Sequence, residues 1–392
     1  MQHAIRLVCG FRHRRLALLA GGTSLLLLLL VSVLRVALDA DLRSWLEEER
    51  CLPQRSVCFV KTHKCASSSV QNVLLRYGES HGLRFVLPAR ANYLGHPRLF
   101  NRSMAALGAP PFDLLAHHAR FNEAEMRAVL RPGAAFVTIV REPASLFESL
   151  YSYYEFRART HLTLEEVAAA AGNASLAGRV QSLVRNRTGS KLGFNQMSFD
   201  LGLEPALFGN ASAVRRFVRR VDAAFDLVMV ADRINESLVL LRHLLCWDVD
   251  DVVVFKHNAR QGTFRQSISV TLATQLRALN AADVQLYEHF ARRFEQRVEV
   301  FGRHRMAEEL RLLEERTQYW YSRCVLRTAQ TNKVTPTRLK FWISSKVLTF
   351  RAKNSSEECT RMMLPELAFT ERLRKKQLKR DDGQGQAPLQ PH

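Results

Sequence analysis

A segment near the start of the globular part of this chain carries the residue types that bind an anion. It runs from Phe59 to Ser69 and contains two lysines and three serines, at Lys61, Lys64, Ser67, Ser68 and Ser69. It lies between an apolar segment typical of a strand and an amphipathic segment typical of a helix. Backbone N–H groups and the positive end of a helix dipole meet at such a junction, so we expect a phosphate or sulfate site. The alternative is a serine N-cap beside two surface lysines.

The same segment lacks the features of a nucleoside-triphosphate loop. That loop has the pattern G-x-x-x-x-G-K-[ST], and neither of its glycines occurs between Phe59 and Ser69. In such enzymes a neighbouring strand commonly ends in an acidic residue that holds Mg²⁺, whereas the apolar segment 137–140 is followed by Arg141. A cation there repels a metal and suits a phosphate. The sequence therefore predicts phosphate binding without a metal.

Arg141 and Ser149 form a second candidate phosphate site. Arg141 follows the apolar segment, and Ser149 lies about two turns into the helix expected after Pro143. A guanidinium group binds phosphate oxygens in a bidentate way, and a serine hydroxyl adds a donor. The alternative is that Arg141 pairs with Glu142 while Ser149 is exposed on the helix.

Two histidines are candidates for a general base. His118 follows the apolar segment 112–115, so it can lie at the end of a strand, and His63 lies inside the anion-binding segment. An unperturbed imidazole titrates near neutral pH and can take a proton from a hydroxyl nucleophile. His118 is the first choice and His63 the competing one, and either can instead be a hydrogen-bonded structural residue. Arg120 is a candidate for orienting a bound ligand.

Apolar segments that alternate with amphipathic segments position these residues. Strands are expected at 57–60, 134–140 and 225–230, and further helices after Pro143, over 236–245 and over most of 271–316. In the first helix Val70, Val73, Leu74 and Tyr77 share one face, and Gly78 and Gly82 mark its end. The pattern predicts an α/β fold with a parallel sheet flanked by helices. We expect one domain over 57–365 and a basic, disordered tail over 366–392.

The N-terminal residues predict a membrane anchor. Several arginines precede an apolar run from Leu16 to Leu34 that is about long enough to cross a hydrocarbon core, and Arg35 and Asp39 follow it. Positive charge before the run places the N-terminus in the cytosol and the rest in the lumen. We expect a cytosolic tail over 1–15, a transmembrane signal anchor over 16–36 and a stem over 37–56. A cleaved signal peptide is the alternative, but the run exceeds a usual signal core.

Sequons and cysteines agree with a lumenal location. Glycosylation sequons follow the predicted anchor at Asn101, Asn173, Asn186, Asn210, Asn235 and Asn354. The cysteines after the anchor are Cys51, Cys58, Cys65, Cys246, Cys324 and Cys359, and the sequence does not choose among their pairings. No spacing of cysteine and histidine matches a zinc site. The formal charge of +20 favours an anionic partner, and the expected compartment argues against nucleic acid.

Several motifs resemble those of the galactose 3-O-sulfotransferase family, which includes galactosylceramide sulfotransferase and its glycoprotein-directed relatives. They are FVKTHKxASS at 59–68, HxRF at 118–121, REPxxLFES at 141–149, FDLG at 199–202 and ESLVLL at 236–241. The resemblance extends from the anchor to about Tyr321, and the composition favours a glycoprotein-directed member. Cys65 stands where the family is expected to have threonine, and Asp232 stands where an Ala-Glu pair is expected, so Asp232 receives no role.

The resemblance implies a P-loop-like sulfotransferase fold that uses 3′-phosphoadenosine 5′-phosphosulfate (PAPS) as sulfate donor and requires no metal. In the family, the loop after the first strand holds the 5′-phosphosulfate. By this resemblance Lys64 contacts the bridging oxygen, the phosphate is held by Thr62, Ala66, Ser67 and Ser68, and the 3′-phosphate is bound by Arg141 and Ser149. An ammonium group stabilises the negative charge that develops on the leaving phosphate.

The resemblance also implies the acceptor, which is the 3-hydroxyl of a non-reducing terminal β-galactose in glycoprotein or glycolipid glycans. We therefore expect a single-pass type II protein of the Golgi membrane with a lumenal catalytic domain, whose catalytic residues are Lys64 and either His118 or His63. The alternatives are a sulfotransferase of another glycan, such as a glycosaminoglycan uronic acid, and a lumenal lectin without turnover. A kinase-like enzyme would depend on magnesium and ATP. The oligomeric state is not predicted.

Overall fold

The computed structural model describes residues 31–33, 35, 51–105, 107–189, 192–255, 268–330, 348–353 and 356–384. It divides into two compact units, residues 1–53 and residues 54–392. The predicted tail over 1–15 and most of the predicted anchor and stem lie outside the described residues. Within the described ranges, no helix has the length and apolar character needed to cross a membrane.

A parallel sheet forms the centre of the second unit. Its strands, among the described residues, are β1 (Val57–Val60), β2 (Leu114–Leu115), β3 (Ala135–Val140) and β4 (Leu227–Val230), in the order β2-β1-β3-β4. Val57 lies opposite both Leu114 and Ala135, and Val137 lies opposite Leu227, all in parallel register. Every strand residue is buried, as continuous apolar strands covered on both faces require. The predicted α/β fold with a parallel sheet is confirmed.

Helices surround the sheet, and a second, antiparallel pair of strands follows them. The elements are α2 (Ser67–Ser80), η1 (Arg102–Met104), α3 (Glu123–Val129), α4 (Pro143–Tyr153), α5 (Phe156–Thr160), α6 (Leu164–Ala168), α7 (Ala174–Arg187), α8 (Gln196–Asp200), η2 (Pro205–Leu207), α9 (Ala211–Ala224), η3 (Ala231–Arg233), α10 (Ile234–Leu245), α11 (Val249–Val252), α12 (Val270–Leu279), α13 (Ala281–Phe301), α14 (Arg303–Cys324), β5 (Val325–Gln330), β6 (Leu348–Ala352), α16 (Glu357–Met363) and α17 (Glu366–Gln384). The expected helices after β1, β3 and β4 are all present.

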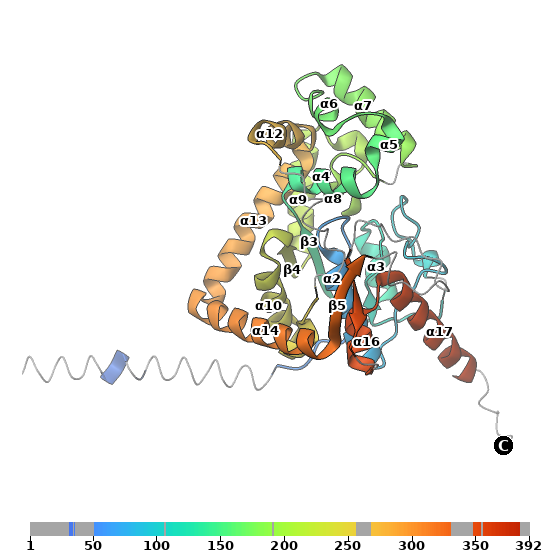
Figure 1. The fold of residues 1–392 in the computed structure, drawn as a ribbon, viewed down its shortest axis with the longest axis vertical. Helices are drawn as coiled ribbons and strands as arrows, with labels where there is room; N and C mark the ends of the chain where they lie inside the picture. The colour runs from blue at the N-terminus through green and yellow to red at the C-terminus, as the bar shows by residue number, and fades with distance from the viewer. Residues whose placement is uncertain are drawn as a thin grey trace, which may run out of the picture. The chain divides into compact units, whose positions relative to one another are not determined.

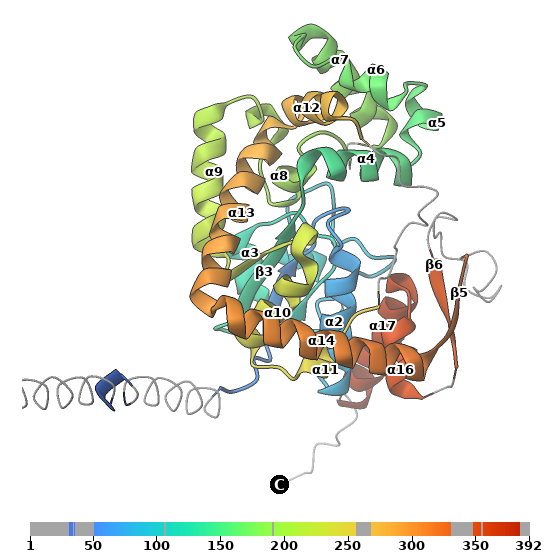
Figure 2. The same ribbon diagram turned by 60° about the vertical axis from the view of Figure 1, so that its left-hand side comes forward.

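The strand order places the loops after β1 and β3 next to each other. The chain moves from β1 to β2 on one side and then returns to β3 on the other side of β1. In parallel sheets, ligands bind at the carboxyl ends of the strands where the order reverses in this way. The helices α2 and α4 begin at this edge, and α4 to α7 gather with α12 beyond it (Figures 1 and 2).

The helices differ in what they cover. In Figure 2, α2 and α10 lie in front of the sheet, and α14 runs across below them. The helix α13 packs against β4, α9 and α8. The expected helical region 271–316 is confirmed as three helices, with breaks at Asn280 and at Gly302, whose φ of 96° lies in the left-handed region that glycine adopts without strain.

A glycine sets the distance between α2 and its neighbours. The sequence marks the end of this helix at Gly78 and Gly82, and the structure continues it to Ser80. A Cβ atom on Gly78 would lie 2.4 Å from both Leu114 Cδ1 and Phe85 Cζ. The absence of a side chain therefore lets the C-terminal part of α2 approach Leu114 of β2 and Phe85 closely.

The C-terminal residues differ from the expectation of disorder. Glu366–Gln384 form α17, which packs against α2, while 385–392 lie outside the described residues. The helix buries Phe369, Thr370 and Leu373. The expectation of disorder rests on the surrounding lysines and arginines, and it does not take this buried contact into account. A disulfide between Cys324 and Cys359 joins the end of α14 to α16, just before α17.

Candidate active site

A cavity of about 1740 Å³ opens at the carboxyl edge of the sheet. It is larger than a typical pocket for one ligand, roughly 300–1,000 Å³. Most of the candidate residues line it, namely His63, Lys64, Ala66, Ser67, Ser68, His118, Arg141 and Ser149. Thr62 is fully buried and does not line it. The structure thus brings together residues that are far apart in the sequence.

The loop between β1 and α2 has a backbone suited to an anion. Lys64 and Ala66 both have a φ of 58°, in the left-handed region, and Cys65 between them does not. Alternation of this kind turns successive N–H groups toward one point and makes an anion-binding concavity. The N-terminus of α2 has no side-chain cap and no acidic residue in its first turn, so its N–H groups and dipole are available to a ligand.

Hydroxyl groups hold this loop in place. Thr62 Oγ1 donates to the carbonyl oxygen of Ile139 at 2.5 Å, which ties the loop to β3, and Ser67 Oγ donates to the carbonyl oxygen of Thr62 at 2.6 Å. The side chain of Thr62 is therefore engaged in the protein interior, whereas Ser67, Ser68 and Ser69 line the cavity.

The two lysines of the loop have different surroundings. Lys64 lines the cavity, with Nζ 3.5 Å from the centre of the Tyr153 ring. Lys61 is 1% exposed, and its Nζ lies 2.8 Å from Gln71 Oε1 and 2.5 Å from Glu366 Oε2. Burial lowers the pKa of Lys61, and the Glu366 charge opposes this shift. Lys64 is therefore the lysine of this loop that can reach a ligand.

Arg141 and Ser149 lie where the sequence predicts. Arg141 follows β3 and donates from Nη1 to the carbonyl oxygen of Lys64 at 2.9 Å, while Ser149 is buried in α4 and lines the cavity. The alternative, in which Arg141 pairs with Glu142, is therefore wrong. Glu142 caps α4, accepting from the backbone of Ala144 and Ser145, and pairs with Arg277 at 3.1 Å.

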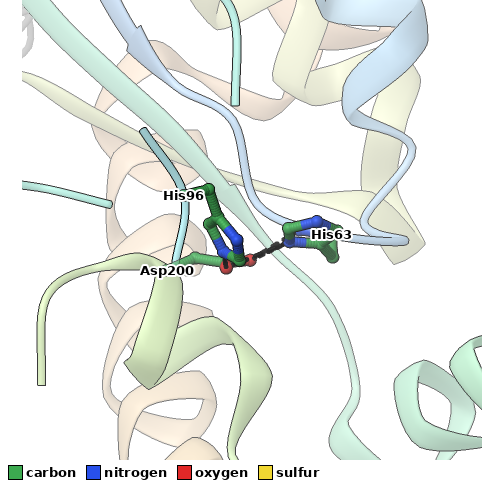
Figure 3. A group of neighbouring side chains, drawn as sticks. All are labelled: His63, His96 and Asp200. Atoms are coloured by element: carbon green, nitrogen blue, oxygen red, sulfur yellow. Dashed lines mark hydrogen bonds and ion pairs between the residues drawn. The ribbon is translucent and has the colours of Figure 1, made fainter. Parts of the chain in front are cut away.

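His63 is oriented by a carboxylate that the sequence analysis left without a role. Its Nδ1 lies 2.9 Å from Asp200 Oδ2, and its backbone N–H donates to the same oxygen at 2.8 Å. The Asp200 side chain comes from the end of α8, and His96 Nε2 lies 3.4 Å from its Oδ1. Figure 3 shows both imidazole rings turned toward this carboxylate. Because Nδ1 of His63 donates to Asp200, Nε2 carries the lone pair; it lies 3.3 Å from Tyr93 Oη.

The charges of this group are mutually supporting. Burial alone would raise the pKa of the Asp200 carboxyl, but the charge and hydrogen bonds of His63, together with those of His96, outweigh it and hold the pKa below its usual range. Gln196 Nε2 adds a hydrogen bond to Asp200 at 2.9 Å. Asp200 is therefore an ionised acceptor at neutral pH, which fixes the tautomer and the orientation of His63.

His118 lies against His63 but is held differently. The two rings stack with their centres 4.2 Å apart. Burial lowers the pKa of His118 well below its usual range; the charge that His63 carries when it is protonated and the charge of Lys61 act in the same direction. A hydrogen bond with the Lys61 backbone opposes this lowering of the pKa, and among the described residues His118 Nδ1 is buried without a hydrogen-bond partner. Both rings line the cavity, and a proton acceptor must also be held in a productive orientation. The hydrogen bond to Asp200 orients His63 in this way, which favours His63 over His118.

Arg120 has a structural role, in contrast to the expectation that it orients a ligand. Its guanidinium group is buried and donates to the backbone carbonyl oxygens of Pro97, Phe199 and Leu203. It also lies 3.9 Å from the centre of the Phe199 ring. Arg120 thereby connects the loop before α3 to the end of α8 and holds Asp200 in position.

His63, His96 and Asp200 also have the donor types of a metal site, since one ligand atom from each lies within 4.8 Å of the others. However, the two Asp200 oxygens already accept from the His63 backbone, His63 Nδ1 and Gln196. A divalent ion would have to displace these bonds. The prediction that no metal is required stays a prediction, and the hydrogen-bonding favours it.

We accordingly expect chelation to leave unchanged the sulfation of galactose that the sequence resemblance implies. The purified protein would be dialysed against EDTA, assayed without added metal, and analysed for bound metals by mass spectrometry. A loss of activity restored by one divalent ion, with about one ion bound per chain, would contradict this expectation and make His63, His96 and Asp200 its ligands.

A sheet edge that carries an anion-binding loop, an arginine and a carboxylate-oriented histidine defines an enzyme that transfers a group from an anionic donor. A model of the galactose-3-O-sulfotransferase family matches residues 1–377. Galactosylceramide sulfotransferase of Mus musculus is 34% identical over 336 residues, which cover 81% of this chain and 78% of the relative. Galactose-3-O-sulfotransferase 3 of Homo sapiens is 34% identical over 346 residues, with 83% and 78% covered, and galactose-3-O-sulfotransferase 4 of Homo sapiens is 31% identical over 414 residues, with 83% and 84% covered.

The chain therefore belongs to the galactose-3-O-sulfotransferase family. It is an enzyme that sulfates galactose.

Proposed function

We propose that this enzyme transfers a sulfuryl group from PAPS to the 3-hydroxyl of a non-reducing terminal β-galactose. The observation that carries the proposal is a single cavity that contains both an uncapped, cationic helix N-terminus and the oriented histidine His63. PAPS supplies the sulfuryl group. The bond from sulfur to the phosphate oxygen breaks, a bond from sulfur to galactose O3 forms, and the O3 proton goes to the enzyme.

The donor fits the loop after β1 and the start of α4. The N–H groups at the start of α2, with Ser67 and Ser68, would hold the 5′-phosphate, and Lys64 would stabilise the charge on the leaving phosphate oxygen. Arg141 and Ser149, which line the same cavity, would bind the 3′-phosphate. The hydrogen bond from Arg141 to the Lys64 carbonyl couples the two phosphate regions.

His63 is the general base of this proposal, with His118 as its supporting neighbour. Asp200 orients His63 so that Nε2 can take the O3 proton, and it stabilises the imidazolium that results. The His118 ring stacks on the imidazole ring of His63 and limits the rotation of that ring. This reverses the order of preference that the sequence suggests.

The location and carrier are part of the proposal. The apolar run from Leu16 to Leu34 and the downstream sequons support a type II Golgi anchor with the enzyme in the lumen. The similarity to a galactosylceramide sulfotransferase and to galactose-3-O-sulfotransferases supports terminal galactose as the acceptor, and we extend this to galactose on both lipid and protein glycans.

The test is an acceptor panel. The purified enzyme would be incubated with labelled PAPS and with N-acetyllactosamine, galactosylceramide or heparan acceptors, followed by linkage analysis of the product. Sulfate on O3 of galactose is expected. Transfer only to uronic acid, or dependence on magnesium and ATP, would refute the proposal, and glycan binding without any product would identify a lectin.

Replacing Arg141 by glutamine should weaken the binding of adenosine 3′,5′-bisphosphate by about 10- to 100-fold, since a hydrogen bond to a charged group contributes about 1.5–3 kcal/mol. Calorimetry would measure the affinity of the wild type and of the variant for this nucleotide. Adenosine 5′-monophosphate, which lacks the 3′-phosphate, is the matched control ligand and should lose little affinity. Equal losses for both nucleotides would mean that Arg141 only supports the Lys64 loop.

A further inference from the structure

The cavity has regions of different charge. Lys64, Arg141 and the start of α2 bring positive charge to one part of it, which suits a doubly charged donor, although Glu142, Glu148 and Asp232 also line the cavity. A second region is lined by Asn92, Tyr93 and Glu366. Glu366 opens α17, whereas Asn92 and Tyr93 lie in the loop before β2. A carboxylate there repels an anionic donor and accepts hydrogen bonds from neutral hydroxyl groups.

Glu366 is anchored from behind and reaches the cavity in front. Its Oε2 pairs with Lys61 Nζ at 2.5 Å, and its Oε1 accepts from Asn92 Nδ2 at 2.9 Å. The Lys61 side chain is 1% exposed, while that of Glu366 is 14% exposed and lines the cavity. Burial alone would raise the pKa of Glu366, but the charge and hydrogen bond of Lys61 and the hydrogen bond of Asn92 outweigh it and lower the pKa.

This region adjoins the proposed base. Tyr93 follows Asn92 directly, and its hydroxyl lies 3.3 Å from His63 Nε2. On the other side, Ser68 Oγ lies 3.4 Å from Glu366 Oε2, so Ser68 marks the boundary with the donor region. A sugar bound against Asn92 and Glu366 would therefore lie beside Tyr93, whose hydroxyl contacts His63, and beside Ser68 of the loop after β1.

We propose that Glu366 and Asn92 form the binding site for the acceptor sugar, where they hydrogen-bond to hydroxyl groups of the galactose other than the one that is sulfated. Glu366 accepts from a sugar hydroxyl, and the Asn92 side-chain amide has both donor and acceptor atoms for a second one. The inference rests on the proposed function, because it assumes that the donor occupies the cationic region.

A competing role for Glu366 would act through Lys61. Neutralising Glu366 leaves Lys61 buried without a carboxylate, and a buried unpaired charge is costly. In that case the variant would distort the loop after β1 and weaken the binding of the donor. The two roles differ in the ligand that is affected, so donor and acceptor must be measured separately.

The test is Glu366→Gln, which keeps the size of the side chain and an oxygen for Lys61. The KM for N-acetyllactosamine should rise by about tenfold, while kcat changes much less, because a lost ground-state contact acts mainly on KM. Calorimetry should find the affinity for adenosine 3′,5′-bisphosphate unchanged. Asn92→Ala is the second variant and should show the same separation, which keeps the inference testable if Glu366→Gln folds poorly.

The matched control is Glu371→Gln on the same helix, where the carboxylate pairs with Arg374 and does not line the cavity. It should leave unchanged both the KM for N-acetyllactosamine and the affinity for adenosine 3′,5′-bisphosphate. The inference is overturned if Glu366→Gln and Asn92→Ala keep the wild-type KM for the acceptor. It is also overturned if these variants instead lower the affinity for adenosine 3′,5′-bisphosphate. A wild-type enzyme that fails to bind adenosine bisphosphate would refute the proposed function itself, which is a separate result.

Discussion

Replacing His63 by glutamine should lower the turnover of galactose sulfation by about 10²–10⁴-fold, the range expected for loss of a general base. Glutamine can still donate to Asp200 from its amide group, but it cannot take a proton from the acceptor hydroxyl. The measurement is kcat at saturating PAPS and N-acetyllactosamine. The affinity for adenosine 3′,5′-bisphosphate should stay near the wild-type value, since the donor is held mainly by other groups.

His118→Gln is the control, because His118 lies in the same cavity and stacks on His63. It should cost much less turnover than His63→Gln, since the His118 ring is bonded to the Lys61 backbone and has its Nδ1 buried. If His118→Gln abolished turnover while His63→Gln retained it, His118 would be the base. A third variant, Asp200→Asn, should also reduce kcat, because it favours the wrong tautomer of His63.

Replacing Lys64 by methionine should lower kcat by about 10²–10³-fold, as is typical when one donor to a developing negative charge is lost. The ammonium group of Lys64 lines the cavity beside the Tyr153 ring. Methionine keeps most of the side-chain volume but cannot stabilise the leaving phosphate oxygen. The affinity for adenosine bisphosphate should fall less than kcat, because the missing interaction is strongest in the transition state.

Lys375→Met is the control for the loss of one positive charge, since Lys375 is exposed on α17 and does not line the cavity. Its kinetics should match those of the wild type. Equal decreases of kcat and of bisphosphate affinity in Lys64→Met would indicate that Lys64 contributes only to ground-state binding of the donor.

Local patterns in the sequence predict the elements that carry the donor region. The strands 57–60 and 135–140 and the helices after them follow from continuous apolar runs and from helical periodicity. Because parallel strands end at the same edge, this also brings the loop after β1 next to Arg141. Ser149 follows from its spacing within one helix. These inferences need only short-range information, which is why they succeed.

Long-range partners could not be predicted in the same way. Asp200 lies in a motif at 199–202 that marks the family, but nothing local indicates that its carboxylate faces His63, which is 137 residues away. Lys61 and Lys64 look equivalent in the sequence, and only the packing of α17 buries one of them. His96 and Glu366 carry no pattern of their own, so the contact of His96 with Asp200 and the position of Glu366 in the cavity emerge only from the tertiary structure.

The ion pair between Lys61 and Glu366 has a consequence for biosynthesis. The cavity joins the first strand of the globular unit to its last helix, and Ser68 and Glu366 are separated by 298 positions. A chain that ends before α17 would contain the loop after β1 but would lack Glu366. If Glu366 forms the acceptor site proposed above, that site can form only after almost the whole polypeptide has been synthesised.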